Sequence, residues 1–327
     1  MDRLLGMGNA LVDALARIDN DDMLRELGLP LGAMTLIDSE RFLKISNLLS
    51  SMPTSMAMGG SACNTVLALG YLGQNPGIIG KVGIDARGEF FRDNCKQHGI
   101  EAYLLSDEST PTGVASTFII PGGQRTFATY LGAAANLTYE DIKPSEFKDY
   151  TYFYIEGYLV QSHDLIERAV EVAAQSGLKI CIDMASYNIV KADKDFFSYL
   201  LPKVNTVFAN EEEAEAYTGK DSRHALSALS DICPTVVVKI GKDGAMTVKE
   251  GVYAQAPAKD VENVIDTTAA GDFFSAGFLY ADAKGASAET CLKAGNVLSG
   301  AVIQTIGTTL SQEAWDGIRS ELKSLGI

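Results

Sequence analysis

Short apolar runs typical of buried strands alternate along this chain with segments whose apolar residues recur every three or four positions. The first pattern predicts strands at 4–8, 77–82, 151–156, 179–183, 206–209 and 236–240. The second predicts helices at 63–72, 88–98, 164–176, 211–218 and 222–232. Such alternation is typical of a mostly parallel sheet. Because runs such as TVVVKI (235–240) are apolar on both faces, we expect helices on both sides of that sheet.

Two stretches, around 11–38 and 99–131, break this rhythm with short alternating runs and turn residues. Within the second stretch, 112–120 and 125–130 predict a β-hairpin joined across 121–124. We therefore expect the two stretches to form a small separate sheet attached to the main body. Helical patterns return near the end of the chain, at 273–283, 288–305 and 312–325.

The predicted fold class is α/β, a three-layer α/β/α domain with a mostly parallel central sheet and a small additional β-sheet. The sequence has no Pro-rich linker, low-complexity tract or fixed-period repeat that would mark a boundary. We therefore expect residues 1–327 to form a single domain, with the small sheet as a sub-region.

The net charge of the chain limits the classes of partner that it can bind. The chain carries 27 Lys and Arg against 42 Asp and Glu, a formal net charge of −15. Because such a surface repels phosphate backbones, we expect no nucleic-acid partner. An anionic ligand, which the motif at 264–280 suggests, would need a local site that offsets this negative charge.

The cysteines and histidines speak against a metal or disulfide framework. No C-x-x-C occurs, and His98, His163 and His224 are scattered along the chain. The N-terminal segment lacks a basic stretch and a small-residue cleavage site, and no apolar run approaches the roughly 20 residues that span a bilayer. These features predict a cytoplasmic protein with no membrane partner.

The most informative stretch is VIDTTAAGDFFSAGFLY at 264–280. A β-prone run meets small residues, then Asp272, then a helical pattern. Small residues allow close approach of a ligand to the backbone, and the amides at a helix start favour an anion. A carboxylate there opposes an anion, unless Asp272 accepts the proton of a hydroxyl that attacks a phosphoryl group. The alternative is an ordinary acid in a first helical turn, stabilised by the helix dipole.

Two segments of the sequence resemble the signatures of a known family. The segment DTTAAGDFFSAGFL (266–279) resembles the D-T-x-G-A-G-D-x-F-x-x-G-F-L signature of the ribokinase-like carbohydrate kinases, also called the PfkB family. The segment 59–73 resembles the family's G-G-x-x-x-N-x-A-x-x-x-x-x-L-G pattern. Two motifs in the right order are more specific than either alone. The segments 8–18, 128–142 and 154–160 resemble the adenosine-kinase-like branch.

The resemblance implies roles for individual residues. It makes Asp272 the catalytic base and the backbone of Ala269, Ala270, Gly271 and Asp272 an anion hole. It implies a β-sheet lid, formed by about 11–38 and 99–131. It places substrate-binding residues at Asp13, Gly59, Gly60, Asn64, Arg125 and Glu156. It places cofactor-binding residues at Asn210, Glu213, Lys239, Gly241, Asp266 and Asn296, with Glu213 reaching a metal through water.

Most of these residues also have a plainer interpretation. Asn210 followed by Glu213 is the spacing of a helix capping box, which explains the pair without a metal. Asn64 could face solvent after an ordinary turn, and Asp13 could be a surface acid in an alternating strand. Arg125 could be a charge that protects the edge of a hairpin.

Ala269 departs from the family pattern, which usually has glycine at this position. A Cβ there costs little if φ is negative, but it is unfavourable if the backbone requires a positive φ. We therefore expect this residue to affect the shape of the anion hole and the rate more than the function.

The resemblance implies a kinase that uses ATP and Mg²⁺ to phosphorylate the primary hydroxyl of a ribose-type sugar, with a nucleoside such as adenosine as the expected substrate. A base pocket could use Tyr158, Phe118, Phe127 and Tyr130, which could equally form the core of the lid. The alternatives are a free-sugar kinase of the ribokinase or fructokinase type and a non-catalytic nucleotide or sugar sensor. No Walker A loop, dinucleotide-binding G-x-G-x-x-G or G-x-S-x-G elbow supports another enzyme class. We expect a monomer or homodimer.

Overall fold

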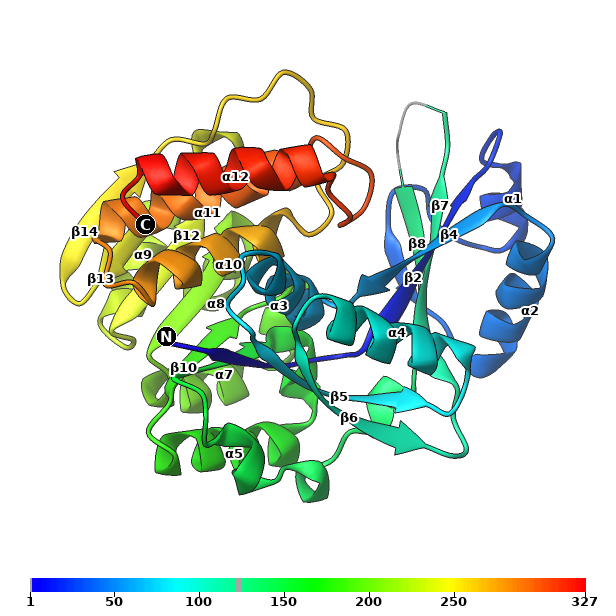
Figure 1. The fold of residues 1–327 in the computed structure, drawn as a ribbon, viewed down its shortest axis with the longest axis horizontal. Helices are drawn as coiled ribbons and strands as arrows, with labels where there is room; N and C mark the ends of the chain where they lie inside the picture. The colour runs from blue at the N-terminus through cyan, green and yellow to red at the C-terminus, as the bar shows by residue number, and fades with distance from the viewer. Residues whose placement is uncertain (1, 122–124) are drawn as a thin grey trace.

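The computed structural model describes residues 2–121 and 125–327, which form a large α/β body with a smaller sheet beside it (Figure 1). In sheet order the nine strands of the large sheet are β14 (Val252–Ala256), β13 (Ala245–Lys249), β12 (Thr235–Lys239), β11 (Thr206–Asn210), β10 (Lys179–Asp183), β9 (Tyr152–Glu156), β1 (Leu4–Met7), β5 (Gly77–Gly83) and β6 (Glu101–Asp107). Neighbouring strands are parallel except for the two pairs made by β13.

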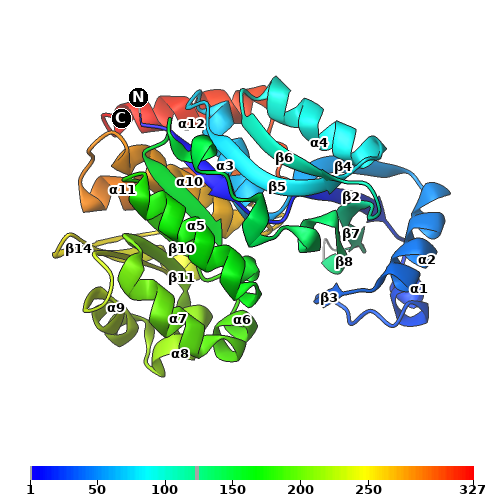
Figure 2. The same ribbon diagram turned by 90° about the horizontal axis from the view of Figure 1, so that it is seen from below.

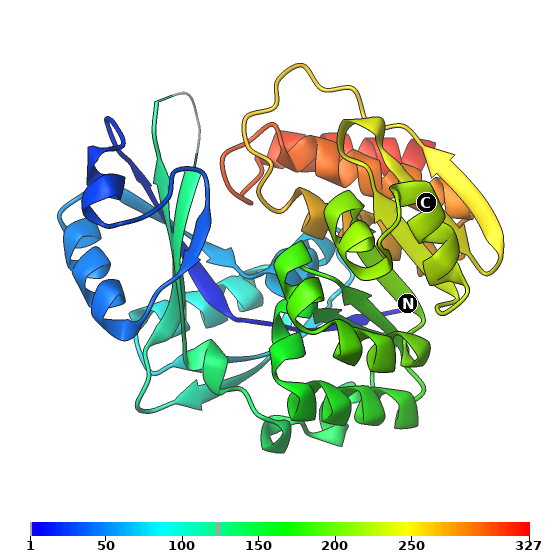
Figure 3. The same ribbon diagram turned by 180° about the vertical axis from the view of Figure 1, so that it is seen from behind.

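Helices cover both faces of the large sheet (Figure 2). One layer contains α3 (Ser61–Tyr71), α4 (Ala86–Gln97), α10 (Ala270–Asp282), α11 (Ala288–Val302) and α12 (Gln312–Ser324). The other contains α5 (His163–Gln175), α6 (Tyr187–Ala192), α7 (Lys194–Leu200), α8 (Glu211–Thr218) and α9 (Ser222–Ser230), seen in front of the sheet in Figure 3. The predicted α/β/α fold class is confirmed.

The side chains of the strands show why both layers are needed. In β1, Leu4 packs into one helical layer and Leu5 into the other. In β9, Tyr152 and Phe153 divide in the same way. Because side chains alternate along a strand, a run that is apolar at every position needs a cover on each face.

The small sheet has five strands in the order β3 (Met34–Leu36), β8 (Arg125–Gly132), β7 (Thr112–Ile119), β2 (Leu11–Arg17) and β4 (Thr54–Gly59). One face packs against α1 (Asp22–Glu26) and α2 (Ser39–Ser50), with Phe118 and Phe42 buried between them. The other face is directed toward the α/β body (Figures 1 and 3).

The boundaries of the small sheet differ from the sequence prediction in two places. The prediction did not include β4, which pairs with β2. It did include β6, which instead pairs in parallel with β5 in the large sheet. The predicted hairpin strands pair as β7 and β8, whereas residues 122–124 of the predicted turn lie outside the described residues. No helix in the described chain is long and apolar enough to cross a membrane.

Candidate active site

A cavity of about 700 Å³ lies between the small sheet and the carboxyl ends of the strands in the large sheet. Its apolar lining comes from both parts of the molecule and includes Leu11, Met34, Leu36, Leu131, Tyr158 and Ile189. Its polar lining includes Ser61, Thr129, Glu156, Gln161 and Asn188. Of the aromatic residues considered for a base pocket, Tyr158 lines this cavity, whereas Phe118 and Tyr130 pack in the core of the small sheet.

Asp272 lies in the first turn of α10, where two side chains of α3 hold its carboxylate. Ser61 Oγ donates to Oδ1 at 2.7 Å, and Asn64 Nδ2 donates to Oδ2 at 2.8 Å. Burial raises the pKa of Asp272 to about 6, although these two hydrogen bonds favour the ionised form. A carboxylate with a pKa near neutrality is suited to accept a proton from a hydroxyl group. Ser61 could not be recognised from the sequence, because its role depends on the approach of α10.

The backbone before Asp272 has the geometry of an anion site. Ala269 is the N-cap of α10 and adopts φ 60°, in the left-handed region that favours glycine. The amide of Ala270 donates to the carbonyl of Thr267 at 3.2 Å. The amides of Gly271 and Asp272 belong to the first turn, where a helix offers them no internal acceptor. These two amides are therefore placed to bind an anion.

Asp13 lies beside a pair of glycines at the junction of the two sheets. A Cβ on Gly59 would collide with the carboxylate of Asp13, and a Cβ on Gly60, where φ is 99°, would collide with the carbonyl of Asn9. Glycine is therefore required at both positions. Burial raises the pKa of Asp13 to about 7, while the charge of Arg125 lowers it.

Arg125 joins the small sheet to the loop that precedes the anion site. Its Nη1 lies 2.7 Å from Oδ2 of Asp266, and both side chains are buried. Asp266 also accepts hydrogen bonds from the amides of Thr268 at 3.0 Å and Gly307 at 2.9 Å. Within the described chain, Nε and Nη2 of Arg125 are buried without a partner. These two groups are free to bind an acceptor that enters the site.

Glu156 lies at the end of β9 and ties the start of α3 to the end of β1. Its carboxylate accepts hydrogen bonds from the amide of Asn9 and the amide of Ala62, both at 2.9 Å. Burial raises the pKa of Glu156 to about 7. Because Ser61 and Asn64 lie on the same first turn of α3, Glu156 helps to fix the residues that hold Asp272.

Asn210 and Glu213 form the capping box that their spacing predicts. Asn210 Oδ1 accepts from the amide of Glu213 at 2.9 Å, and Glu213 Oε2 accepts from the amide of Asn210 at 2.8 Å. Burial raises the pKa of Glu213, and the carboxylate of Asp183 raises it further. Among the described residues, no three His, Cys, Asp or Glu side chains gather as a metal site. Asn210 and Glu213 fit a magnesium ion that is held through water, because Mg²⁺ in kinases keeps several waters and uses few protein carboxylates.

The remaining predicted cofactor residues come from β12, from the turn that follows it and from α11. Lys239 ends β12 and lies close to Gly271. Gly241 follows it in a turn with φ 54°. Asn296, on α11, donates from Nδ2 to the carbonyl of Pro257 at 2.7 Å. The structure therefore brings Lys239 to the anion site, whereas no hydrogen bond links Asn296 to that cluster within the described chain.

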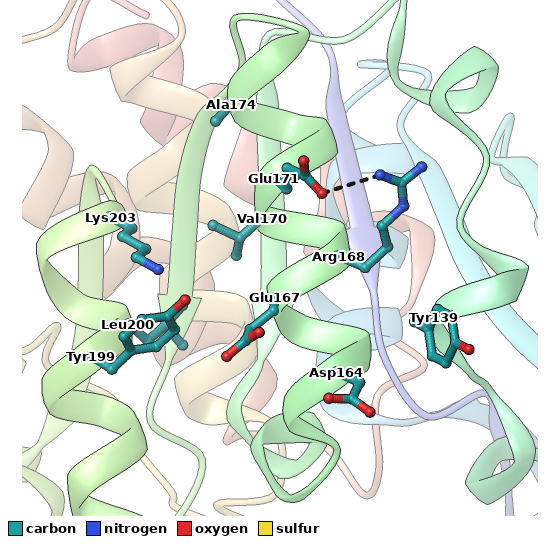
Figure 4. Close-up of a pocket in the computed structure, with 10 residues that line it drawn as sticks. All are labelled: Tyr139, Asp164, Glu167, Arg168, Val170, Glu171, Ala174, Tyr199, Leu200 and Lys203. Carbon is teal, nitrogen blue, oxygen red and sulfur yellow. Dashed lines mark hydrogen bonds and ion pairs between the residues drawn. The ribbon is translucent and has the colours of Figure 1, made fainter.

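A second hollow, of about 600 Å³, lies on the outer helical layer between α5 and α7 (Figure 4). Five of its ten lining residues are charged, and Arg168 forms an ion pair with Glu171 across 3.2 Å. None of the predicted site residues lines it. Of the predicted site residues, Gly60 and Glu156 line the cavity of about 700 Å³, and Ser61, which also lines it, donates a hydrogen bond to Asp272.

Comparison with known proteins agrees with this geometry. Residues 34–315 match the family model described as pfkB family carbohydrate kinase. The chain is 27% identical to adenosine kinase 2 of Arabidopsis thaliana over 95% of this chain and 96% of that protein. A crystal structure of adenosine kinase from Sinorhizobium meliloti is 33% identical, with a TM-score of 0.88 over 98% of this chain and 99% of that one. A probable sugar kinase from Rhizobium etli is 31% identical, with a TM-score of 0.88 over 99% of both chains.

Proposed function

The chain belongs to the pfkB family of carbohydrate kinases, and we propose that its phosphate acceptor is the primary hydroxyl of a nucleoside such as adenosine. It is an ATP-dependent carbohydrate or nucleoside kinase. The observation that carries the nucleoside assignment is the cavity of about 700 Å³, which extends from Ser61 and Glu156 to an apolar wall formed by the small sheet and by helical segments of the α/β body. A free sugar presents little apolar surface to such a wall, whereas a nucleobase presents an aromatic ring. The adenosine kinases among its relatives support the same choice.

In the proposed reaction, Asp272 takes the proton of the hydroxyl as its oxygen bonds to the γ-phosphorus of ATP. The bond from that phosphorus to the bridging oxygen breaks, and the bridging oxygen leaves on ADP with the electron pair. The products are a nucleoside monophosphate, ADP and a proton held on Asp272. Ser61 and Asn64 orient the carboxylate through their hydrogen bonds, and the amides of Gly271 and Asp272 bind the transferring group.

The remaining residues of the site have supporting roles in this proposal. Asp13 and Asn64 bind sugar hydroxyls at the glycine corner, and the small sheet acts as a lid that excludes water. Glu213 would hold Mg²⁺ through water, and the ion would offset the charge of the ATP phosphates. Arg125 offers its unpartnered nitrogens to the transferred phosphate. A local set of amides and cations thus binds phosphate within a protein of net charge −15.

A coupled assay of ADP release tests the proposal, with MgATP and adenosine, inosine, guanosine, cytidine, ribose or fructose as the acceptor. We expect ADP release with adenosine and formation of its 5′-monophosphate. A response to fructose or ribose alone would instead favour the free-sugar kinase, to which the similarity to a probable sugar kinase lends support. If no acceptor of either kind gives ADP release although MgATP still binds, the non-catalytic sensor would be favoured.

A further inference from the structure

A buried ion pair lies at the carboxyl ends of two strands beside the anion site. Lys239 at the end of β12 reaches across β11 to Asp183 at the end of β10, and Nζ lies 2.7 Å from Oδ2. The two side chains are 16% and 7% exposed. Asp183 is held in turn by the amide of Ala185, which donates to its Oδ1 at 2.9 Å. The ammonium group of Lys239 is therefore held in one position.

The ammonium group of Lys239 lies next to Gly271. A Cβ at residue 271 would stand only 3.0 Å from Nζ of Lys239. Gly271 also supplies one of the first-turn amides of α10, so the lysine charge lies next to the residue that carries this amide. A helix start and a fixed cation together form a stronger anion site than either does alone.

The surroundings keep Lys239 charged. Burial alone would lower its pKa, but the carboxylates of Asp183, Glu213 and Asp272 hold the pKa of Lys239 above its usual value. A buried ion pair seldom stabilises a fold more than apolar residues of similar size do. The stability of the fold alone therefore does not explain the pair of Lys239 and Asp183.

We propose that Lys239 is a catalytic residue that contacts the transferring phosphoryl group, and that Asp183 is a positioning residue that holds its ammonium beside Gly271. This inference rests on the proposed kinase reaction. As negative charge shifts from the γ-phosphoryl group toward ADP, a cation already in place stabilises it without reorganisation. The role is therefore in the chemical step and not in binding of the acceptor.

The test compares Lys239→Met with a matched control, Lys249→Met. Lys249 also forms a buried pair, with Asp282 at 2.6 Å, and the side chains are 15% and 10% exposed. It ends β13, opposite Thr235 at the start of β12, and so lies at the other edge of the sheet. We expect Lys239→Met to lower kcat about 100-fold or more while KM for the acceptor changes little. Lys249→Met should leave kcat close to that of the parent enzyme.

The pH profile separates catalysis from a purely structural effect. The charged groups that face Asp272 are Asp183 and Lys239, and the carboxylates of Asp13 and Glu156 are also close enough to interact with it. Lys239 lowers the pKa of Asp272 and Asp183 raises it. The acidic limb of activity should therefore move to higher pH in Lys239→Met and to lower pH in Asp183→Asn, although both variants lose kcat.

Equal kcat values for Lys239→Met and the parent, or acidic limbs that do not move, would overturn the inference. If the parent enzyme releases ADP with another acceptor and not with adenosine, the nucleoside proposal fails and the variants are compared with that acceptor. The two ideas can thus fail separately.

Discussion

Replacing Ala269 with glycine should make the protein at least as stable as the parent, the reverse of the usual effect of this substitution near a helix. Ala269 has φ 60°, where an L-residue with a Cβ is strained by roughly 1–2 kcal/mol. Glycine removes that strain but gives the unfolded chain more freedom, which costs about 0.4–1 kcal/mol. The two effects leave a net gain between zero and about 1.6 kcal/mol.

Ala314→Gly provides the matched control. Ala314 lies in α12, and it is partly buried against the same core as Ala269. Glycine at this position gives the unfolded chain the same extra freedom but relieves no strain. The substitution should therefore lower the free energy of unfolding by about 1 kcal/mol. Urea unfolding followed by circular dichroism measures both variants, and the midpoints should differ in the direction of a more stable Ala269→Gly. Equal destabilisation by the two substitutions would refute the reasoning that the anion site holds a strained residue.

Two further predictions concern the residues around the base. Arg125→Met should destabilise the fold by about 3–5 kcal/mol, because it leaves Asp266 buried without its cation. In a double-mutant cycle, adding Asp266→Asn to that variant should cost much less than Asp266→Asn alone, and additive losses would contradict the pairing. Ser61→Ala should raise the pKa of Asp272, since the serine hydrogen bond lowers it. The acidic limb of kcat/KM should then move above pH 6, and an unmoved limb would exclude this contact in solution.

The layered fold could be predicted because its signal is local. Runs such as 235–240 are apolar on both faces, and this pattern alone requires a sheet between two helical layers. The predicted strand at 179–183 and the predicted helix at 211–218 have the observed bounds. The parts that were missed have weaker patterns. The edge strands β4 and β14 each have three exposed residues, so their burial gives only a weak pattern.

The candidate site was predictable only where its residues share one motif. Asp272 and its small neighbours are contiguous, so the sequence places them together at a helix start. Ser61 and Asp183 were missed because each acts through a residue far along the chain, Asp272 and Lys239 respectively. No spacing rule encodes such contacts. The strain at Ala269 was conditional on a backbone angle, and only the structure supplies that angle.

The central claim is that Asp272 is the base of a phosphoryl transfer, and single-turnover kinetics of Asp272→Asn test it most directly. Asparagine keeps the size and the contact with Ser61 but cannot accept the proton. With MgATP and the acceptor found by the ADP-release assay, the account predicts a rate about 10²–10⁴-fold below the parent and an unchanged affinity for the acceptor. A rate close to that of the parent would contradict the account.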